Sequence, residues 1–309
     1  MKSADRAFIA LTGLALLSAA ILVALLASLL PHLPRLARAE GDLVGDTVPA
    51  LILLLASIGI ALGLASLARQ LWATLQLIRG LLRVRVPAPA AVSTLGAELG
   101  IAGRVDVVAD DRPFAFTYWF LRPRICVSTG LVRRLECPEL RAVLSHERYH
   151  LVHRDPLRVV VARYFAAGLY VVPVINDLVS HYVMLKEIAA DEDAVRAIGA
   201  VGPLARALYR LMPHAEEVQL GLLAPVGGLS VTEARIEQLV ERRPIGAPLD
   251  ATHVALSLAT LAGALALLLA PLPLPPAAPN VALALPSAAV ILLAAIAGVP
   301  QQFRAVTQR

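Results

Sequence analysis

Long runs without a charged side chain constrain the fold of this protein more than any other feature of its sequence. Two of them, Ala7–Leu30 and Thr47–Ala68, each exceed the 20 or so residues with which a helix crosses a bilayer. A third stretch has no charged residue between Asp250 and Arg304, and the proline-rich segment Pro271–Asn280 divides it in two. We therefore predict four transmembrane helices.

The composition and the placement of basic residues agree with a membrane protein. Hydrophobic residues make up 58% of the chain and charged residues 17%, and the mean hydropathy of +0.71 lies outside the range of soluble proteins. The third and fourth spans are predicted at His253–Ala270 and Val281–Val299. By the positive-inside rule both termini are cytoplasmic, because one side carries most of the flanking basic residues: Lys2, Arg6, Arg69, Arg79, Arg83, Arg85, Arg242, Arg243, Arg304 and Arg309.

This topology divides the chain into three parts. Residues 1–68 are expected to form two transmembrane helices, residues 69–251 a cytoplasmic domain, and residues 252–309 two further helices with a short basic tail. Contact with the anionic lipid of the bilayer accounts for the net charge of +5, so we expect no direct nucleic-acid binding. An alternative is cleavage of a secretory signal at Ala37-Arg38-Ala39, but the preceding apolar run is longer than a signal core.

The predicted cytoplasmic domain contains an H-E-x-x-H motif formed by His146, Glu147 and His150. Pro138 suits the first turn of a helix, and apolar residues then recur at helical spacing to about Arg154. On such a helix the two imidazoles share a face and can hold one Zn²⁺, while Glu147 lies beside the metal and can take a proton from a water molecule. The alternative is a solvated helix face that happens to carry these residues.

A catalytic zinc site needs a third protein ligand, which a second acidic motif can supply. Glu187 follows His150 by 37 residues, and Asp191 lies one helical turn further on the same face. Glu187 could give a carboxylate oxygen to the metal, and Asp191 could hydrogen-bond the outer nitrogen of a ligating histidine. Because Glu192 and Asp193 follow directly, the alternative is an acidic helix surface.

The strongly apolar segment 157–183 separates the two halves of this predicted site. If it crossed the bilayer once, Glu187 would lie about 30 Å from His150 and no zinc site could form. We therefore expect a buried or re-entrant helical hairpin that bends near Pro173 and returns Glu187 to the metal.

A clear β signal precedes the motif. Aromatic residues alternate over Phe114–Phe120, Ile125–Val127 follows after a turn, and Val105–Val108 adds a third strand. The expected sheet packs against the catalytic helix, and its exposed edge could also bind an extended peptide. The two cysteines, Cys126 and Cys137, are too few for a zinc framework and are expected in the core.

H-E-x-x-H followed by E-x-x-A-D resembles the gluzincin membrane peptidases. The segments Ser145–Leu157 (SHERYHLVHRDPL) and Leu121–Ile125 (LRPRI) are similar to the antirepressor peptidases of the BlaR/MecR type. The resemblance covers about Asp110 to Val240 and implies a bacterial plasma-membrane enzyme. The expected fold class is thus a mainly α membrane protein with four spans and a cytoplasmic α+β gluzincin-like zinc peptidase domain. The resemblance implies one zinc ion per chain with Glu147 as catalytic acid/base and His146, His150 and Glu187 as ligands.

One part of the gluzincin pattern is incomplete. Related housekeeping enzymes carry a His-Pro pair six residues before an Arg-Ile pair, and the histidine helps to stabilise the tetrahedral intermediate. This chain has Arg235-Ile236, but Leu229-Ser230 stand where His-Pro would be. Arg235 is therefore a candidate for transition-state contact, with an ordinary surface arginine as the alternative.

For the substrate, the resemblance implies regulated cleavage of a cytoplasmic winged-helix repressor. Sensors of that group carry a large extracellular domain after their last span, whereas this sequence stops ten residues beyond Val299, so we expect no such sensor domain. Two alternatives are a housekeeping quality-control peptidase of the membrane and a non-catalytic membrane protein that binds partners through a vestigial metal site.

Overall fold

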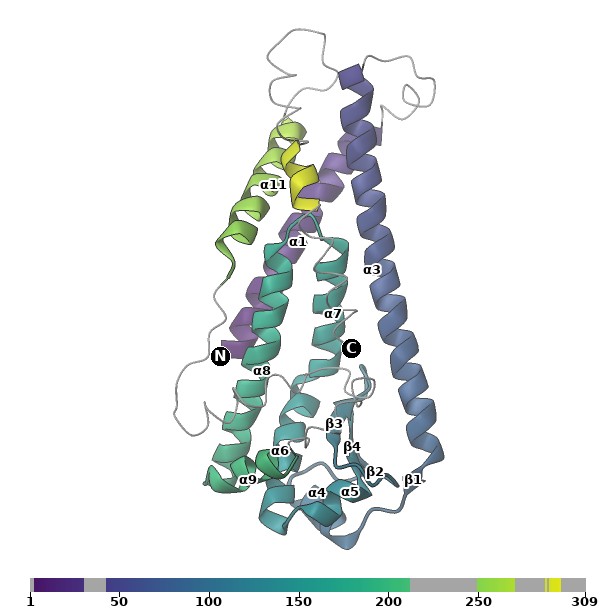
Figure 1. The fold of residues 1–309 in the computed structure, drawn as a ribbon, viewed down its shortest axis with the longest axis vertical. Helices are drawn as coiled ribbons and strands as arrows, with labels where there is room; N and C mark the ends of the chain where they lie inside the picture. Colours follow the sequence, from purple (N-terminus) through teal and green to yellow (C-terminus); the bar gives the residue numbers. More distant parts are fainter. Residues whose placement is uncertain (1–2, 31–42, 212–248, 270–286, 288, 296–309) are drawn as a thin grey trace. The chain divides into compact units, whose positions relative to one another are not determined.

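The computed structural model describes residues 3–30, 43–211, 249–269, 287 and 289–295 (Figure 1). The chain divides into two compact units, which are described separately. The first unit contains the H-E-x-x-H motif and comprises Met1–Arg6, Arg69–Val161 and His181–Ala247; the second comprises Ala7–Ala68, Ala162–Ser180 and Pro248–Arg309.

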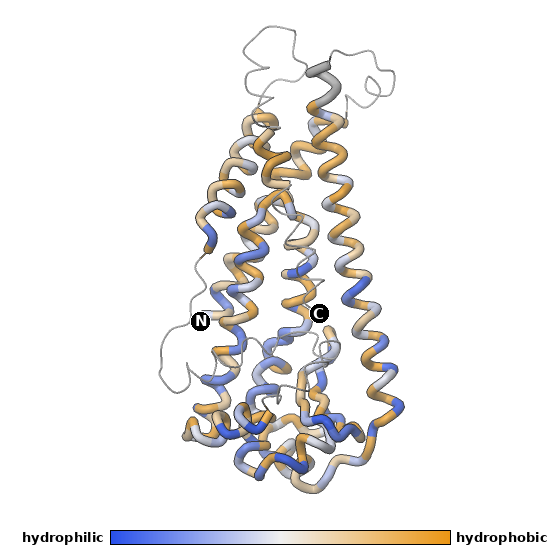
Figure 2. The backbone as a smooth tube through the Cα atoms, in the orientation of Figure 1, coloured by the Kyte–Doolittle hydropathy of each residue, from blue (hydrophilic) through white to orange (hydrophobic). Residues whose placement is uncertain are grey.

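Three helices among the described residues are long and apolar enough to cross a membrane. They are α1 (Ser3–Leu29), the part of α3 (Leu43–Arg83) from Val48 onward, and α11 (Ala251–Leu269). Figure 2 shows hydrophobic residues along α1, α11 and the first part of α3. These helices support the prediction of a membrane protein, with candidate spans at the first three predicted positions. Most of the fourth predicted span, Val281–Val299, lies outside the described residues.

The apolar segment after the motif forms two helices rather than one long helix. They are α7 (Asp155–Gly168) and α8 (Val174–Ile198), and the chain reverses direction between them at residues 169–173 (Figure 1). Neither belongs to the candidate spans. The bend includes Pro173, as the sequence predicts, and entry of the hairpin into the membrane stays a prediction.

In the second unit α7 packs closely against α3 because glycines meet there. A Cβ atom at Gly59 would lie 2.5 Å from the carbonyl oxygen of Gly168, and one at Gly63 would lie 3.3 Å from its Cα. Small residues let helix backbones approach this closely in membranes. The hydroxyl of Tyr170, in the turn after α7, donates to the carbonyl of Leu55 at 3.1 Å, which fixes the hairpin to α3.

The first unit is built on a four-stranded sheet with the order β1-β2-β4-β3. β2 and β4 are parallel, the other two pairs are antiparallel, and β3 is an edge strand. Three of the strands confirm the predicted sheet, whereas the two-residue β1 has no sequence signal of its own. The strands are β1 (Arg85–Val86), β2 (Val105–Val108), β3 (Ala115–Tyr118) and β4 (Arg124–Ser128).

Helices cover both faces of this sheet. One face packs on α4 (Ala90–Glu98) and α6 (Cys137–His153) through a core that includes Val107, Ile125 and Leu144. On the other face Cys126 is buried near the last turns of α3.

The prediction that both cysteines lie in the core is half correct, because Cys126 is buried but Cys137, the first residue of α6, is exposed. Two short helices complete the described part of this unit, α5 (Thr129–Arg134) and α9 (Gly202–Leu211).

Candidate metal centre

Both ends of α6 are fixed by local contacts, which place the motif in the middle of a regular helix. At the start, Glu136 and Glu139 form a capping box, and the buried Glu139 carboxylate also accepts hydrogen bonds from Arg206 and Arg210 of α9. At the end, Arg154 adopts the left-handed conformation with φ of 52°. The helix therefore begins and ends where the sequence predicts.

The two histidines of the motif are buried, and their Nε2 atoms lie 3.1 Å apart. Each Nδ1 faces a carboxylate: His146 Nδ1 lies 2.8 Å from Asp191 Oδ1, and His150 Nδ1 lies 2.7 Å from Asp155 Oδ2. Because a carboxylate accepts a hydrogen bond, each Nδ1 carries a proton and each neutral ring keeps its lone pair on Nε2. When both rings are neutral, their two lone pairs cannot bond to each other, so the gap suits either one metal cation that accepts both or, without a metal, a proton on one Nε2.

Glu187 of α8 completes a triangle of donor atoms. Its Oε2 lies 3.4 Å from His146 Nε2 and 3.7 Å from His150 Nε2. Tetrahedral zinc with bonds of about 2.0–2.2 Å separates its ligand atoms by about 3.3–3.6 Å. The triangle therefore has the size and the donor types of a zinc site. The structure brings the three predicted ligands together, with the predicted Asp191 behind His146.

The charges in this cluster favour a cation. Burial raises the pKa of Glu187, but Lys186 and His150 outweigh it and hold the pKa well below its usual range. Burial lowers the pKa of His150, but the charge of Glu187 and the hydrogen bond to Asp155 raise it to about 9. Without a metal, His150 therefore holds a proton at neutral pH that a bound metal ion must displace.

Glu147 lies outside the triangle and faces the sheet. The hydroxyl of Thr117, in edge strand β3, lies 2.8 Å from Glu147 Oε2 and 3.0 Å from the Glu147 carbonyl oxygen. The general base predicted from the sequence is thus held next to the strand edge.

Three residues of this centre were not predicted. Thr117 contacts Glu147, Asp155 orients His150, and Lys186 Nζ lies 2.7 Å from Glu187 Oε1 with both side chains buried. Of these three, only Asp155 could have been found from the sequence. It lies five positions after His150, at the start of the next helix. The remaining predicted site residue, Arg235, lies outside the described residues.

We expect Asp155→Asn to weaken zinc binding about 10–100-fold, the usual effect of removing a carboxylate behind a ligating histidine. Asparagine keeps an acceptor for His150 Nδ1–H but removes the negative charge that makes the imidazole a better ligand. Competition with a chromogenic chelator measures the affinity. As the matched control, Asp193→Asn removes a carboxylate of α8 that pairs with the exposed Arg196 and should leave the affinity unchanged. Equal affinities in the two variants would exclude this role for Asp155.

Comparison with known proteins connects this geometry to a family. The sequence profile described as Peptidase family M48 matches residues 90–253, which is more than half of the chain. The chain belongs to peptidase family M48. M48 peptidases are metal-dependent and typically bind zinc, and all three candidate ligands lie inside the matched region. The predicted metallopeptidase is confirmed at the level of this family, and the closer likeness to the BlaR/MecR group stays a prediction.

Two curated M48 relatives match parts of the chain. Protease HtpX homolog 1 of Streptomyces coelicolor is 49% identical over 49 residues, which are 15% of this chain and 16% of the relative. Protease HtpX homolog of Halobacterium salinarum is 32% identical over 120 residues, which are 30% of this chain and 42% of the relative. The chain thus matches less than half the length of either relative. No solved structure gives a significant match.

Proposed function

We propose that this M48 protein is a zinc-dependent endopeptidase of the membrane that hydrolyses peptide bonds of a protein substrate on the cytoplasmic side. The observation that supports it best is the convergence of three buried donor atoms, His146 Nε2, His150 Nε2 and Glu187 Oε2, beside a carboxylate that is not part of the triangle. A purely structural zinc site has four protein ligands, whereas a catalytic site has three and leaves one position open for water. The three donor atoms and the nearby carboxylate therefore match a catalytic site.

The residues around the triangle have distinct roles in this proposal. When bound, zinc would lower the pKa of a water molecule toward about 7 and polarise the scissile carbonyl. Glu147 accepts a proton from the attacking water and passes it to the leaving amine. Thr117 orients the Glu147 carboxylate through Oε2, and Asp191 and Asp155 fix the two imidazoles.

The edge strand gives the substrate a place to bind. Strand β3 pairs only with β4 among the described strands, and its Thr117 touches Glu147. An extended peptide that pairs with this edge would run beside the general base, and main-chain hydrogen bonds would hold it with little dependence on sequence. Arg235 stays the candidate for contact with the transition state.

The physiological role has two versions. Cleavage of a winged-helix repressor in regulated signalling follows from the resemblance of Ser145–Leu157 and Leu121–Ile125 to antirepressor peptidases. Quality control of membrane proteins is the alternative version, and the matches to two proteins named as HtpX-type proteases support proteolysis in either version. We favour the first version because one of those two segments, Ser145–Leu157, contains the motif itself.

Metal analysis of the detergent-solubilised full chain, combined with casein cleavage, tests the proposed activity. We expect about one zinc ion per chain, loss of both metal and proteolysis after chelation, and recovery of both when zinc is returned. Cleavage of a repressor at one bond would support the signalling version, and degradation of unfolded membrane proteins at many bonds would support quality control. Failure to bind zinc even after reloading would refute the proposal.

A further inference from the structure

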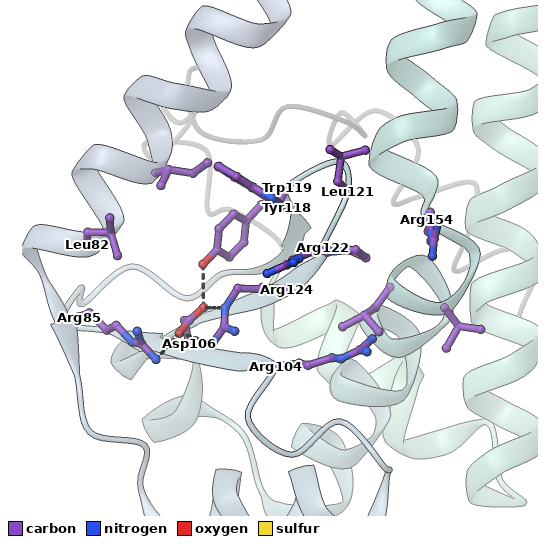
Figure 3. A pocket seen from close by; sticks show the side chains of 14 residues that line it. Leu82, Arg85, Arg104, Asp106, Tyr118, Trp119, Leu121, Arg122, Arg124 and Arg154 are labelled. Carbon is purple, nitrogen blue, oxygen red and sulfur yellow. Dashed lines mark hydrogen bonds and ion pairs between the residues drawn. The ribbon is translucent and has the colours of Figure 1, made fainter.

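The first unit also contains a cavity of about 1020 Å³ at the end of α3, separate from the metal centre (Figure 3). Its walls come from the last turns of α3, the sheet, the loop between β3 and β4, and the C-terminal end of α6. None of the described residues of the metal centre lines it. Its size lies at the upper end of ligand pockets, about 300–1,000 Å³. Five arginines and one carboxylate line it: Arg85, Arg104, Arg122, Arg124, Arg154 and Asp106.

The single carboxylate pairs with two of the five arginines and offsets one of their positive charges. Asp106 Oδ1 lies 2.7 Å from Arg85 Nη2 and 2.8 Å from Arg124 Nη2, and Asp106 Oδ2 accepts a hydrogen bond of 2.7 Å from the Tyr118 hydroxyl (Figure 3). Burial raises the pKa of Asp106, but these hydrogen bonds and charges outweigh it, so the pKa is lowered. Asp106 therefore stays ionised, and its carboxylate is already engaged by Arg85, Arg124 and Tyr118.

The other three arginines have no ion pair with any residue that the structure describes. Arg104, Arg122 and Arg154 are exposed and come from three separate places, the start of β2, the β3–β4 loop and the end of α6. All three line one cavity without a described counter-charge. Guanidinium groups bind phosphate and carboxylate groups through two parallel hydrogen bonds, so the cavity has the chemistry of an anion site.

Backbone strain marks the same cavity. Trp119, in the loop between β3 and β4, has a φ of 69°; the other described non-glycine residue with positive φ, Arg154, ends α6, where this conformation is common. Side chains with a Cβ atom disfavour this conformation, which glycine would adopt without cost. The strained residue Trp119 lines the cavity. Strain of this kind concentrates at sites that hold a ligand, where it sets the direction of a side chain.

The rim of the cavity is apolar and exposed, which points to lipid. Leu121 and Val152 are 72% and 57% exposed, and Trp119 of the same loop is also exposed. On α3, the apolar residues Leu71, Leu75, Ile78 and Leu82 recur at helical spacing within the last part of the candidate span Val48–Arg83, and Ile78 and Leu82 form part of the cavity wall. Such a stripe is unfavourable in water and favourable against acyl chains. Arginine and tryptophan together are typical of the membrane interface.

We propose that this cavity binds the headgroup of an anionic phospholipid. Arg104, Arg122 and Arg154 contact the phosphate, and the exposed apolar side chains of the rim contact the first part of the acyl chains. Basic pockets beside membrane helices recognise anionic headgroups in this way. The site would attach the peptidase unit to the cytoplasmic surface of the bilayer next to its substrate.

Native mass spectrometry of the detergent-solubilised full chain tests the proposal with two short-chain lipids, dioctanoyl phosphatidylglycerol and dioctanoyl phosphatidylcholine. We expect the anionic lipid to bind at least about tenfold more tightly, given three arginines at the site. The triple variant R104Q/R122Q/R154Q should bind the two lipids within about a factor of two. As a matched control, R133Q/R134Q/R196Q removes the same charge from exposed positions outside the cavity and should keep the preference.

Three results would overturn the proposal. Equal loss of the preference in both triple variants would mean that net charge alone binds the lipid. Competition by glycerol phosphate at the same concentration as phosphatidylglycerol would mean that the apolar rim is not used. Binding of an acidic peptide in place of the lipid, lost in R104Q/R122Q/R154Q, would make the cavity a peptide site. If the triple variant unfolds, the single substitution Arg122→Glu at an exposed position replaces it in the test and should also weaken the preference for the anionic lipid. Because the readout is lipid binding, none of these results bears on proteolysis.

Discussion

Glu147→Gln is expected to lower proteolysis by about 10²–10⁴-fold while zinc stays bound at one ion per chain, because the substitution removes a general base and no ligand. Glu147 is buried beside the donor triangle, and its Oε2 contacts Thr117 rather than the two histidines. Glutamine has the same shape and can still accept the Thr117 hydrogen bond, but it cannot take a proton from water. Substrate binding along β3 should be unaffected.

The measurement pairs zinc content with the rate of casein cleavage on the same purified sample. Glu192→Gln is the matched control, since it removes a carboxylate from the exposed face of α8 and should leave both quantities unchanged. Loss of zinc together with activity in Glu147→Gln would place Glu147 among the groups that hold the metal and contradict its role as the base. Full activity with zinc bound would require another base.

The sequence could predict those parts of the site that depend on local patterns. The start of α6 follows from Pro138 in its first turn, and its extent follows from apolar residues at helical spacing up to about Arg154. The position of Glu187 follows from a topological argument, because a zinc site is incompatible with a single membrane crossing between Glu187 and His150. Both inferences use residue spacing alone, and the structure agrees with both geometries.

The unpredicted residues are those whose neighbours are fixed by tertiary structure. Thr117 is 30 residues from Glu147, and their contact depends on how β3 packs beside α6. Lys186 reads as an ordinary cation in the sequence, and only the fold shows that it is buried against Glu187. The cavity at the end of α3 is invisible in the sequence for the same reason, because its arginines come from separate strands, loops and helices.

The second large effect is expected for Glu187→Gln, which should abolish stoichiometric zinc binding and destabilise the metal-free protein. The metal affinity should fall by more than the roughly 10–100-fold expected for a carboxylate behind a histidine, because here a ligand itself loses its charge. In addition, Lys186 would keep its buried charge without the carboxylate that lies 2.7 Å away. Leaving one member of a buried ion pair uncompensated costs about 3–5 kcal/mol of unfolding free energy.

A second substitution separates the two effects. In Lys186→Met/Glu187→Gln the uncompensated charge is gone, so the thermal unfolding midpoint of the metal-free protein should return close to the parent value, while zinc binding stays lost. Lys186→Met alone should keep the metal, because Oε2 of Glu187 and the two imidazoles are unchanged. Stoichiometric zinc in Glu187→Gln would remove Glu187 from the ligand set. A double variant as unstable as Glu187→Gln would show that the ion pair is not the source of the instability. If both expectations hold, Glu187 has two functions: Oε2 binds the metal, and Oε1 neutralises a lysine that the fold buries beside it.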